Sequence, residues 1–183
     1  MRLRGGCFLI ASPTLRDPNF ARTVVLLCEH GEHGSLGLVV NRPTEHSVSD
    51  AISGVPESAT QPLFWGGPVQ QHVVLVLHRH RFDAPDGEEI ADGMALGSDS
   101  DVLMQILESA PNASSQVRVF SGYAGWGSGQ LEAEMEEHSW IVRPGTARLV
   151  FDVDPESVWS ESLIELGPRY AHLTTMPLDP RVN

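Results

Sequence analysis

The sequence predicts one α+β domain, and three observations support this fold class. The chain has 183 residues, of which 41% are hydrophobic, and this is enough to form one buried core. Seventeen glycines and thirteen prolines imply many turns, as in a β-rich or mixed fold rather than a helical bundle. Short apolar runs typical of strands alternate with two clear helical patterns. Without an internal repeat or a long linker, the whole of 1–183 is expected to be a single domain.

The first half of the chain is predicted to consist mainly of strands. In chain order we expect strands at 6–11, 22–28, 36–40, 63–65 and 72–78, with a short helix at 47–53. The run at 22–28 is apolar throughout, which is typical of a strand buried on both faces. The polar loop after it is short, so an antiparallel hairpin should follow. Asn41-Arg42-Pro43 should end the next strand, because proline cannot continue a ladder.

The second half is predicted to add the helices. A loop or irregular hairpin at 79–93 and a short strand at 94–97 come first. Ser98 and Asp101 then fit a weakened capping box for a helix that Pro111 ends. A strand is expected at 140–142. Asp154-Pro155 supplies an N-cap and a first-turn proline for a second helix, whose apolar residues include Val158, Trp159, Leu163 and Leu166. The tail at 170–183 is expected to be partly mobile.

Residues 117–136 form the most informative segment of the chain. A strand at Val117–Phe120 is followed by a loop with glycines at 122, 125, 127 and 129, and a helix is expected from about Gln130. Two large aromatics lie between the glycines, which indicates a tightly folded strand–loop–helix junction rather than a solvated linker. Such a junction can bind an anion at the helix start, but the GxGxxG spacing is absent and Glu132 and Glu134 would repel a phosphate. Structural packing is therefore favoured over ligand contact.

The charge of the chain limits its partners. Twenty-four acidic residues stand against twelve basic ones, all of them arginine, for a formal charge of −12. Direct nucleic-acid binding is disfavoured, because it depends largely on phosphate neutralisation. The absence of lysine excludes a Walker A loop and a Schiff-base lysine.

A cytoplasmic protein without membrane segments is expected. The apolar runs are about five residues long, far short of the roughly 20 residues that a membrane-spanning helix needs, and the N-terminus lacks the signal-peptide layout. Cys7 and Cys28 fall in predicted strands that could be neighbours, so a disulfide stays open, although a reducing compartment favours two buried thiols.

Several sequence blocks resemble, in the same order, those of the bacterial YqgE/AlgH family. The matching blocks are 6–13, 17–20, 22–25, 28–30, 37–43, 66–69 and 122–132. The resemblance implies a single α+β domain with a strongly curved, mostly antiparallel β-sheet and flanking helices. The family is commonly labelled a transcriptional regulator without an established mechanism, so the resemblance supplies no reaction, cofactor or catalytic residue.

The candidate binding residues lie in three segments that a compact fold could bring together. Arginines at the ends of strands can bind a carboxylate or phosphate, although in an acidic chain a salt bridge, here to Glu29 or Asp17, is the commoner role. A cleft between the glycine loop at 122–129, Gly66-Gly67-Pro68 and Asn41-Arg42-Pro43 is the predicted location. The candidate ligand-binding residues are Arg22, Asn41, Arg42, Gly66, Gly67, Gly122, Tyr123, Gly125, Trp126 and Gly127.

No catalytic, metal or cofactor site is predicted. Pairs such as His30 with His33, and His78 with His80, occur without HExxH or CxxC spacing, and zinc needs three or four convergent ligands. Ser121 and Cys28 lack a recognisable base, because neighbours in a strand point to opposite faces.

Three functional hypotheses remain. The favoured one is a cytoplasmic regulatory or interaction protein without clear catalytic machinery, which works through a protein or small-molecule partner and would affect transcription only indirectly. The alternative is a small-ligand or anion-binding protein, or an enzyme, that uses the cleft near 122–129. The third is a homo-oligomer held by exposed aromatics such as Trp65 or Trp159.

Overall fold

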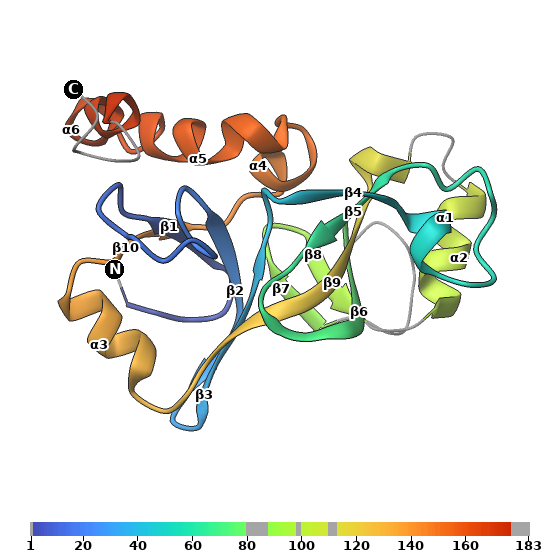
Figure 1. Cartoon of the computed structure of the whole chain (residues 1–183), viewed down its shortest axis with the longest axis horizontal. Coiled ribbons are helices and arrows are strands. Elements are labelled where there is room, and N and C mark those ends of the chain that lie inside the picture. The colour runs from blue at the N-terminus through green and yellow to red at the C-terminus, as the bar shows by residue number, and fades with distance from the viewer. Residues whose placement is uncertain (1, 80–87, 98–99, 110–112, 177–183) are drawn as a thin grey trace.

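The computed structural model of the protein has a strongly curved β-sheet at its centre, with helices around it (Figure 1). It describes residues 2–79, 88–97, 100–109 and 113–176. The strands are β1 (Cys7–Ala11), β2 (Val24–Gly31), β3 (Gly34–Val39), β4 (Pro43–Ser47), β5 (Pro62–Trp65), β6 (Val69–Arg79), β7 (Glu88–Ala91), β8 (Met94–Gly97), β9 (Val117–Trp126) and β10 (Trp140–Pro144). The helices are α1 (Val48–Ala51), α2 (Ser100–Ser109), α3 (Gln130–Glu136), α4 (Ala147–Phe151), α5 (Pro155–Ile164) and α6 (Pro168–Ala171), with 3₁₀ turns at Ala113–Ser115 and His172–Thr175.

The sheet follows the order β10-β1-β2-β3-β9-β6-β8-β7, and β5 joins β4 to β9 beside this path. Among the described residues every strand pairing is antiparallel except that of β5 with β9. The long strand β9 runs diagonally through Figure 1 and joins the two halves of the molecule. The predicted α+β fold with a curved, mostly antiparallel sheet is therefore confirmed.

Strand β1 shows how the sheet is buried on both of its faces. Side chains alternate along a strand, so Phe8 and Ile10 join the core cluster beneath α5, while Leu9 and Ala11 join the cluster on the opposite face. In β2, residues 24–27 are likewise fully buried, as the unbroken apolar run predicted. Each such side chain contributes about 1.5–3 kcal/mol by leaving water.

A third core cluster lies at the other end of the molecule. Val48 of α1 and Leu103 and Ile106 of α2 pack there against β5, β6 and the first half of β9. In Figure 1, α1 and α2 lie at the opposite end from α3 and the N-terminus. The short predicted helix at 47–53 is observed as α1, where Ser47 and Asp50 form a capping box.

Helix α5 forms as predicted and covers β1. The side chain of Asp154 accepts a hydrogen bond from the amide of Glu156 at 2.9 Å, and Pro155 occupies the first turn. The inward face carries Trp159, which is 4% exposed and whose indole nitrogen donates to the carbonyl of Ala11 at 2.9 Å. Trp159 is therefore not the exposed aromatic that the sequence suggested for a subunit contact, because the packing of α5 on β1 buries it.

The glycine-rich segment differs from its prediction. Residues 121–126 were expected to be a loop, but they belong to β9, whose second half pairs with β3 through Ala124–Trp126. The pairing satisfies the backbone hydrogen-bond groups, so the glycines do not interrupt the strand. The loop proper is only 127–129, and α3 begins at Gln130 as predicted.

Other differences lie in short elements. Helix α4 and strands β4 and β7 were not predicted individually, because each has only four or five residues. Ser98, Ala110 and Pro111 lie outside the described residues, as does the end of the tail at 177–183, whereas α6 and His172–Thr175 show that the tail begins with helical turns. No helix in the described part combines the length and the apolar character that a membrane-spanning helix requires.

Candidate functional site

The three segments of the predicted cleft do converge. The amide of Gly66 donates to the carbonyl of Ser121 at 3.0 Å, and the amide of Trp65 donates to the carbonyl of Arg42 at 2.8 Å. The backbones lie so close that a Cβ atom on Gly66 would stand 2.2 Å from the carbonyl oxygen of Gly122. Backbone therefore fills the space between these glycines, which leaves no cleft at the crossing itself.

Asn41 and Arg42 hold the turn that precedes β2. The side chain of Asn41 accepts from the amide of Val24 at 2.9 Å and donates to the carbonyl of Arg22 at 3.0 Å. Arg42 donates to the carbonyl of Ala21 at 2.8 Å. The expected salt bridges of Arg22 and Arg42 to Glu29 or Asp17 are absent from the described part of the chain. Both guanidinium groups donate to backbone carbonyls instead.

Arg22 and Arg42 differ in what they leave accessible. Arg22 donates to the carbonyl of Met176 at 2.6 Å and lies over the ring of Trp159, 5.1 Å from its centroid. Arg42 lines a shallow cavity of about 290 Å³ with Pro18, Asn19, Pro43 and Trp65. A ligand-binding role for either arginine stays a prediction, and the geometry favours Arg42.

The remaining candidates of the glycine-rich segment make packing and backbone contacts, and a binding role for them stays a prediction. Trp126 is 6% exposed and forms an aromatic cluster with Phe20 and Trp140, with ring centroids 5.6–6.2 Å apart. Tyr123 packs against the core beneath α5. The amide of Gly127 donates to the side chain of Gln130 at 3.1 Å, and Gly125 pairs across from Leu36 of β3. These contacts position α3 against the sheet.

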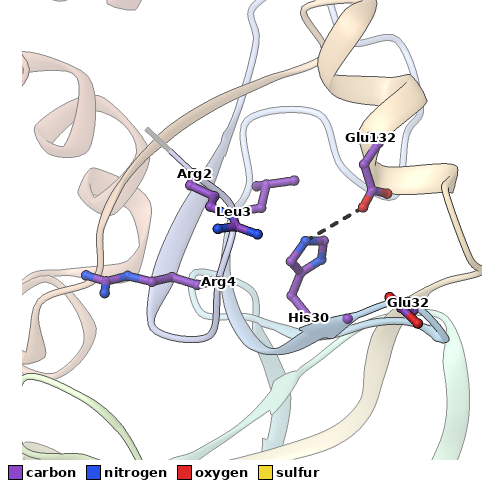
Figure 2. A pocket seen from close by; sticks show the side chains of 7 residues that line it. Arg2, Leu3, Arg4, His30, Glu32 and Glu132 are labelled. Atoms are coloured by element: carbon purple, nitrogen blue, oxygen red, sulfur yellow. Dashed lines mark ion pairs between the residues drawn. The ribbon is translucent and has the colours of Figure 1, made fainter.

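A large cavity lies just beyond this segment (Figure 2). Its volume is about 920 Å³, and its walls come from the N-terminal segment, the β2–β3 hairpin and α3. The lining residues are Arg2, Leu3, Arg4, His30, Gly31, Glu32 and Glu132. Leu3 anchors the N-terminal segment by packing on the core cluster around Trp126. The glycine-rich turn also fixes the hairpin, because the hydroxyl of Ser128 donates to the carbonyl of Glu32 at 2.7 Å.

The charges in this cavity are separated. Arg2 and Arg4 lie on one side and Glu32 and Glu132 on the other, with the ring of His30 between them (Figure 2). Neither guanidinium group has a hydrogen bond or ion pair to another residue in the part of the chain that the structure describes. The cavity thus presents unpaired cations opposite carboxylates.

His30 makes two polar contacts that resemble a catalytic triad only in composition. Its Nδ1 atom lies 2.8 Å from the hydroxyl of Ser35, and its Nε2 atom lies 3.6 Å from a carboxylate oxygen of Glu132. The second distance is too long for a direct hydrogen bond. Ser35 is not among the residues that line the cavity. The contacts hold the imidazole in place.

Other polar side chains named from the sequence are used elsewhere. Ser121 donates to the carbonyl of Gln71. Cys7 and Cys28 are both free thiols, and burial, together with the adjacent carboxylate of Glu29, raises the pKa of Cys28 well above its ordinary value. His78 is buried and His80 lies outside the described residues. Within the described ranges no three His, Cys, Asp or Glu side chains converge as metal ligands.

The sequence did not reveal the residues of the large cavity as a group. No local pattern singled out Arg2 or Arg4, and Glu132 appeared only as a carboxylate at the start of the predicted helix. Their proximity depends on the position of α3, which follows from the course of β9. The one signal in the sequence was Leu3, an apolar residue between two arginines, which suggests an anchored rather than a free terminus.

Comparisons with known proteins agree with this fold. The model of the AlgH-like family matches residues 8–171. The chain is 44% identical over 182 residues to the UPF0301 protein CT0663 of Chlorobaculum tepidum, covering 99% of this chain and 96% of that protein. It is 42% identical over 183 residues to a UPF0301 protein of Chlorobium limicola, covering 100% of this chain and 97% of the relative.

Two solved structures are also similar. The solution structure of the AlgH protein from Pseudomonas aeruginosa has a TM-score of 0.75 at 33% sequence identity, and the match covers 97% of this chain and 98% of that one. The crystal structure of protein DIP2367 from Corynebacterium diphtheriae has a TM-score of 0.77 at 24% identity, over 96% of this chain and 94% of that one, and supports the fold alone. These names describe no reaction, ligand or partner. On its sequence and its fold, the chain belongs to the AlgH-like family.

Proposed function

We propose that this protein is a cytoplasmic regulatory binding protein that takes up a small zwitterionic ligand in the 920 Å³ cavity and catalyses no reaction. The observation that carries the proposal is the separation of charge across that cavity. Arg2 and Arg4 lie on one side of the cavity, with the guanidinium of Arg2 turned toward His30 and that of Arg4 turned outward, and Glu132 lies on the other side (Figure 2). A ligand with a carboxylate or phosphate at one end and an amine at the other complements both sides.

The unpaired state of the two arginines supports a ligand. Acidic residues outnumber basic ones two to one in this chain, so carboxylates are abundant. Other arginines use them: Arg79 pairs with Asp152 at 2.6 Å, and Arg143 pairs with Glu165 at 2.6 Å. The side chains of Arg2 and Arg4 are exposed and have no described partner, so they supply charge beside the cavity that a ligand can use.

Two other functional classes receive less support. Nucleic-acid binding requires a concentration of positive charge, whereas the formal charge here is −12. A large apolar docking face is also missing from the described surface, where Ile164 and Met176 are the exposed large hydrophobic residues. An effect on transcription would on this proposal pass from the ligand-bound protein to a protein partner.

A length series of ω-amino acids, from glycine to 6-aminohexanoate, tests the proposal by thermal shift and calorimetry. A ligand that binds only the native state at a hundred times its Kd adds about 2.7 kcal/mol of stability, or roughly 5–10 °C in Tm for a domain of this size. We expect one length to stabilise the protein more than its singly charged analogues, the matching fatty acid and the matching amine.

Variants connect this effect to the cavity. The double substitution Arg2→Gln with Arg4→Gln, and separately Glu132→Gln, should each reduce the affinity at least about tenfold by removing a charged hydrogen-bond partner. Arg169→Gln removes an exposed arginine that does not line the cavity and should leave the affinity unchanged. Equal binding of zwitterions and singly charged analogues, or equal binding by all these variants, would refute the proposal.

A further inference from the structure

A second cavity of about 360 Å³ contains a buried arginine. Arg118 lies in the first half of β9 and is 6% exposed. Its guanidinium group donates to the carbonyl of Val40 at 3.1 Å and to that of Val153 at 3.5 Å, and it lies 4.3 Å from the centroid of the Phe64 ring. A guanidinium group carries five N–H donors, so these two carbonyls leave donor capacity for a further acceptor.

The charge of Arg118 has no ion-pair partner among the described residues. Asp152 lines the same cavity but pairs with Arg79, and the carboxylate of Asp154 caps α5. Burial lowers the pKa of Arg118 to about 10, and the nearby charges of Asp154 and Asp152 oppose this only in part. A buried cation without an ion-pair partner lowers the stability of the folded state, and such groups concentrate at binding sites.

A second donor lines this cavity. The side-chain nitrogen of Gln61 is buried and has no hydrogen-bond partner. Leaving a buried donor unpaired costs free energy, and native proteins rarely do so without a reason. The side-chain nitrogen of Gln61 and the guanidinium of Arg118 both donate, and a carboxylate oxygen is an acceptor that suits both.

The rest of the wall is largely apolar. Pro62, Phe64 and Val117 contribute from β5 and β9, Phe151 from the end of α4 and Pro155 from the start of α5. We propose that this cavity binds a small monocarboxylate with a flat apolar body, whose carboxylate meets Arg118 and Gln61 while the body lies against Phe64 and Phe151. A dianion such as phosphate is disfavoured, because Asp152 and Asp154 lie close by.

This site is independent of the zwitterion cavity. It is formed by β5, β9 and the α4–α5 connection, whereas the larger cavity is formed by the N-terminal segment, the β2–β3 hairpin and α3. The two proposals can therefore fail separately: the triple variant Arg2→Gln, Arg4→Gln, Glu132→Gln should bind a monocarboxylate as the unaltered protein does.

Ligand-detected NMR and calorimetry with benzoate test the proposal on the full chain. Benzamide and benzyl alcohol keep the ring without the charge, and inorganic phosphate keeps a charge without the ring. We expect benzoate to bind at least about tenfold more tightly than any of the three. If phosphate binds as tightly as benzoate, or if benzyl alcohol does, the assignment is wrong.

Gln61→Leu is the decisive variant, because it removes an unpaired donor and should not lower Tm. It should weaken benzoate binding by at least about tenfold, the loss expected for one hydrogen bond to a charged group. The control Gln71→Leu changes an exposed glutamine and should bind benzoate as the unaltered protein does. Arg118→Met should abolish binding, and if it does not fold, Gln61→Leu still decides. Unchanged affinity in Gln61→Leu would overturn the proposal.

Discussion

The indole nitrogens of Trp126 and Trp140 donate to the same oxygen of Glu134, over 3.0 and 2.7 Å. Trp126 ends β9, Glu134 lies in α3 and Trp140 begins β10, so one carboxylate joins three consecutive elements. Both rings are buried, and their N–H groups need an acceptor inside the protein. The acidic helix that follows the glycine-rich segment is thus held in place by one of its own carboxylates.

Glu134→Ala should destabilise the protein by about 2–4 kcal/mol, because two buried donors lose their acceptor. Glu134→Gln keeps an acceptor oxygen that both indoles can share and loses the charge, so it should cost less than Glu134→Ala. Urea unfolding followed by tryptophan fluorescence measures both. Glu136→Ala removes an exposed carboxylate of the same helix and should stay within about 0.5 kcal/mol. A Glu134→Ala effect as small as that of Glu136→Ala would contradict the structural role.

Gly66→Ala should be among the most damaging single substitutions. Its Cβ atom would stand 2.2 Å from the carbonyl oxygen of Gly122, and a backbone atom cannot move aside cheaply. We expect a loss of more than about 3 kcal/mol in unfolding free energy, the range of severe overpacking. Gly31→Ala is the matched control, since its Cβ meets nothing within 4 Å and should change stability by under about 0.5 kcal/mol. Equal stability of the two variants would show that β5 and β9 do not cross so closely.

Asn41→Ala separates a structural role from a ligand-binding one. Arg22 has a φ of 54°, a region that favours glycine, and Asn41 holds this turn through the carbonyl of Arg22 and the amide of Val24. We expect a loss of about 1–3 kcal/mol in chemical denaturation, because a buried amide is left unpaired. Wild-type stability in Asn41→Ala, together with altered ligand affinity, would instead favour the binding role that the sequence suggested.

Glu165→Gln should show a pH-dependent loss of stability. Partial burial of Glu165 raises the pKa of its carboxyl, but the ion pairs with Arg143 and Arg148 outweigh burial and hold that pKa below its ordinary value. A folded pKa below the unfolded one stabilises the protein above the unfolded pKa, and this contribution is lost as the pH falls through the folded pKa. The variant should therefore lose about 0.5–1 kcal/mol at pH 7, since the pair is partly exposed.

Denaturation at several pH values measures this loss. The difference between Glu165→Gln and the unaltered protein should shrink as the pH falls below about 4. Glu136→Gln, on an exposed carboxylate without a described ion pair, should show no such pH dependence. A difference that is the same at pH 3 and pH 7 would mean that the ion pairs contribute nothing.

Local sequence signals predicted the elements that have strong boundaries. Asp154-Pro155 predicted the start of α5, because a capping carboxylate and a first-turn proline act within four residues. The apolar run before Cys28 predicted a strand buried on both faces. By contrast, the glycines at 122 and 125 suggested a loop, since glycine has a low strand propensity. The prediction was wrong because strand pairing with β3, which local preference does not reveal, supplies the hydrogen bonds.

The candidate sites were harder to predict than the fold. The sequence suggested that the side chains of Asn41 and Arg42 are free to bind a ligand. In the structure they form hydrogen bonds with backbone groups of residues 21–24. Arg118 drew no notice in a sequence that contains twelve arginines, because its burial depends on β5 and on the α4–α5 connection.

By itself, the sequence determined the α+β class, the family and the positions of the main strands and helices, since apolar periodicity and capping act over short distances along the chain. Only the tertiary structure decided which charged side chains lie together. Arg2 lines one cavity with Glu132, and Arg118 lines another with Gln61, across separations that no local preference spans. These meetings result from strand pairing and core packing, which depend on the whole chain at once.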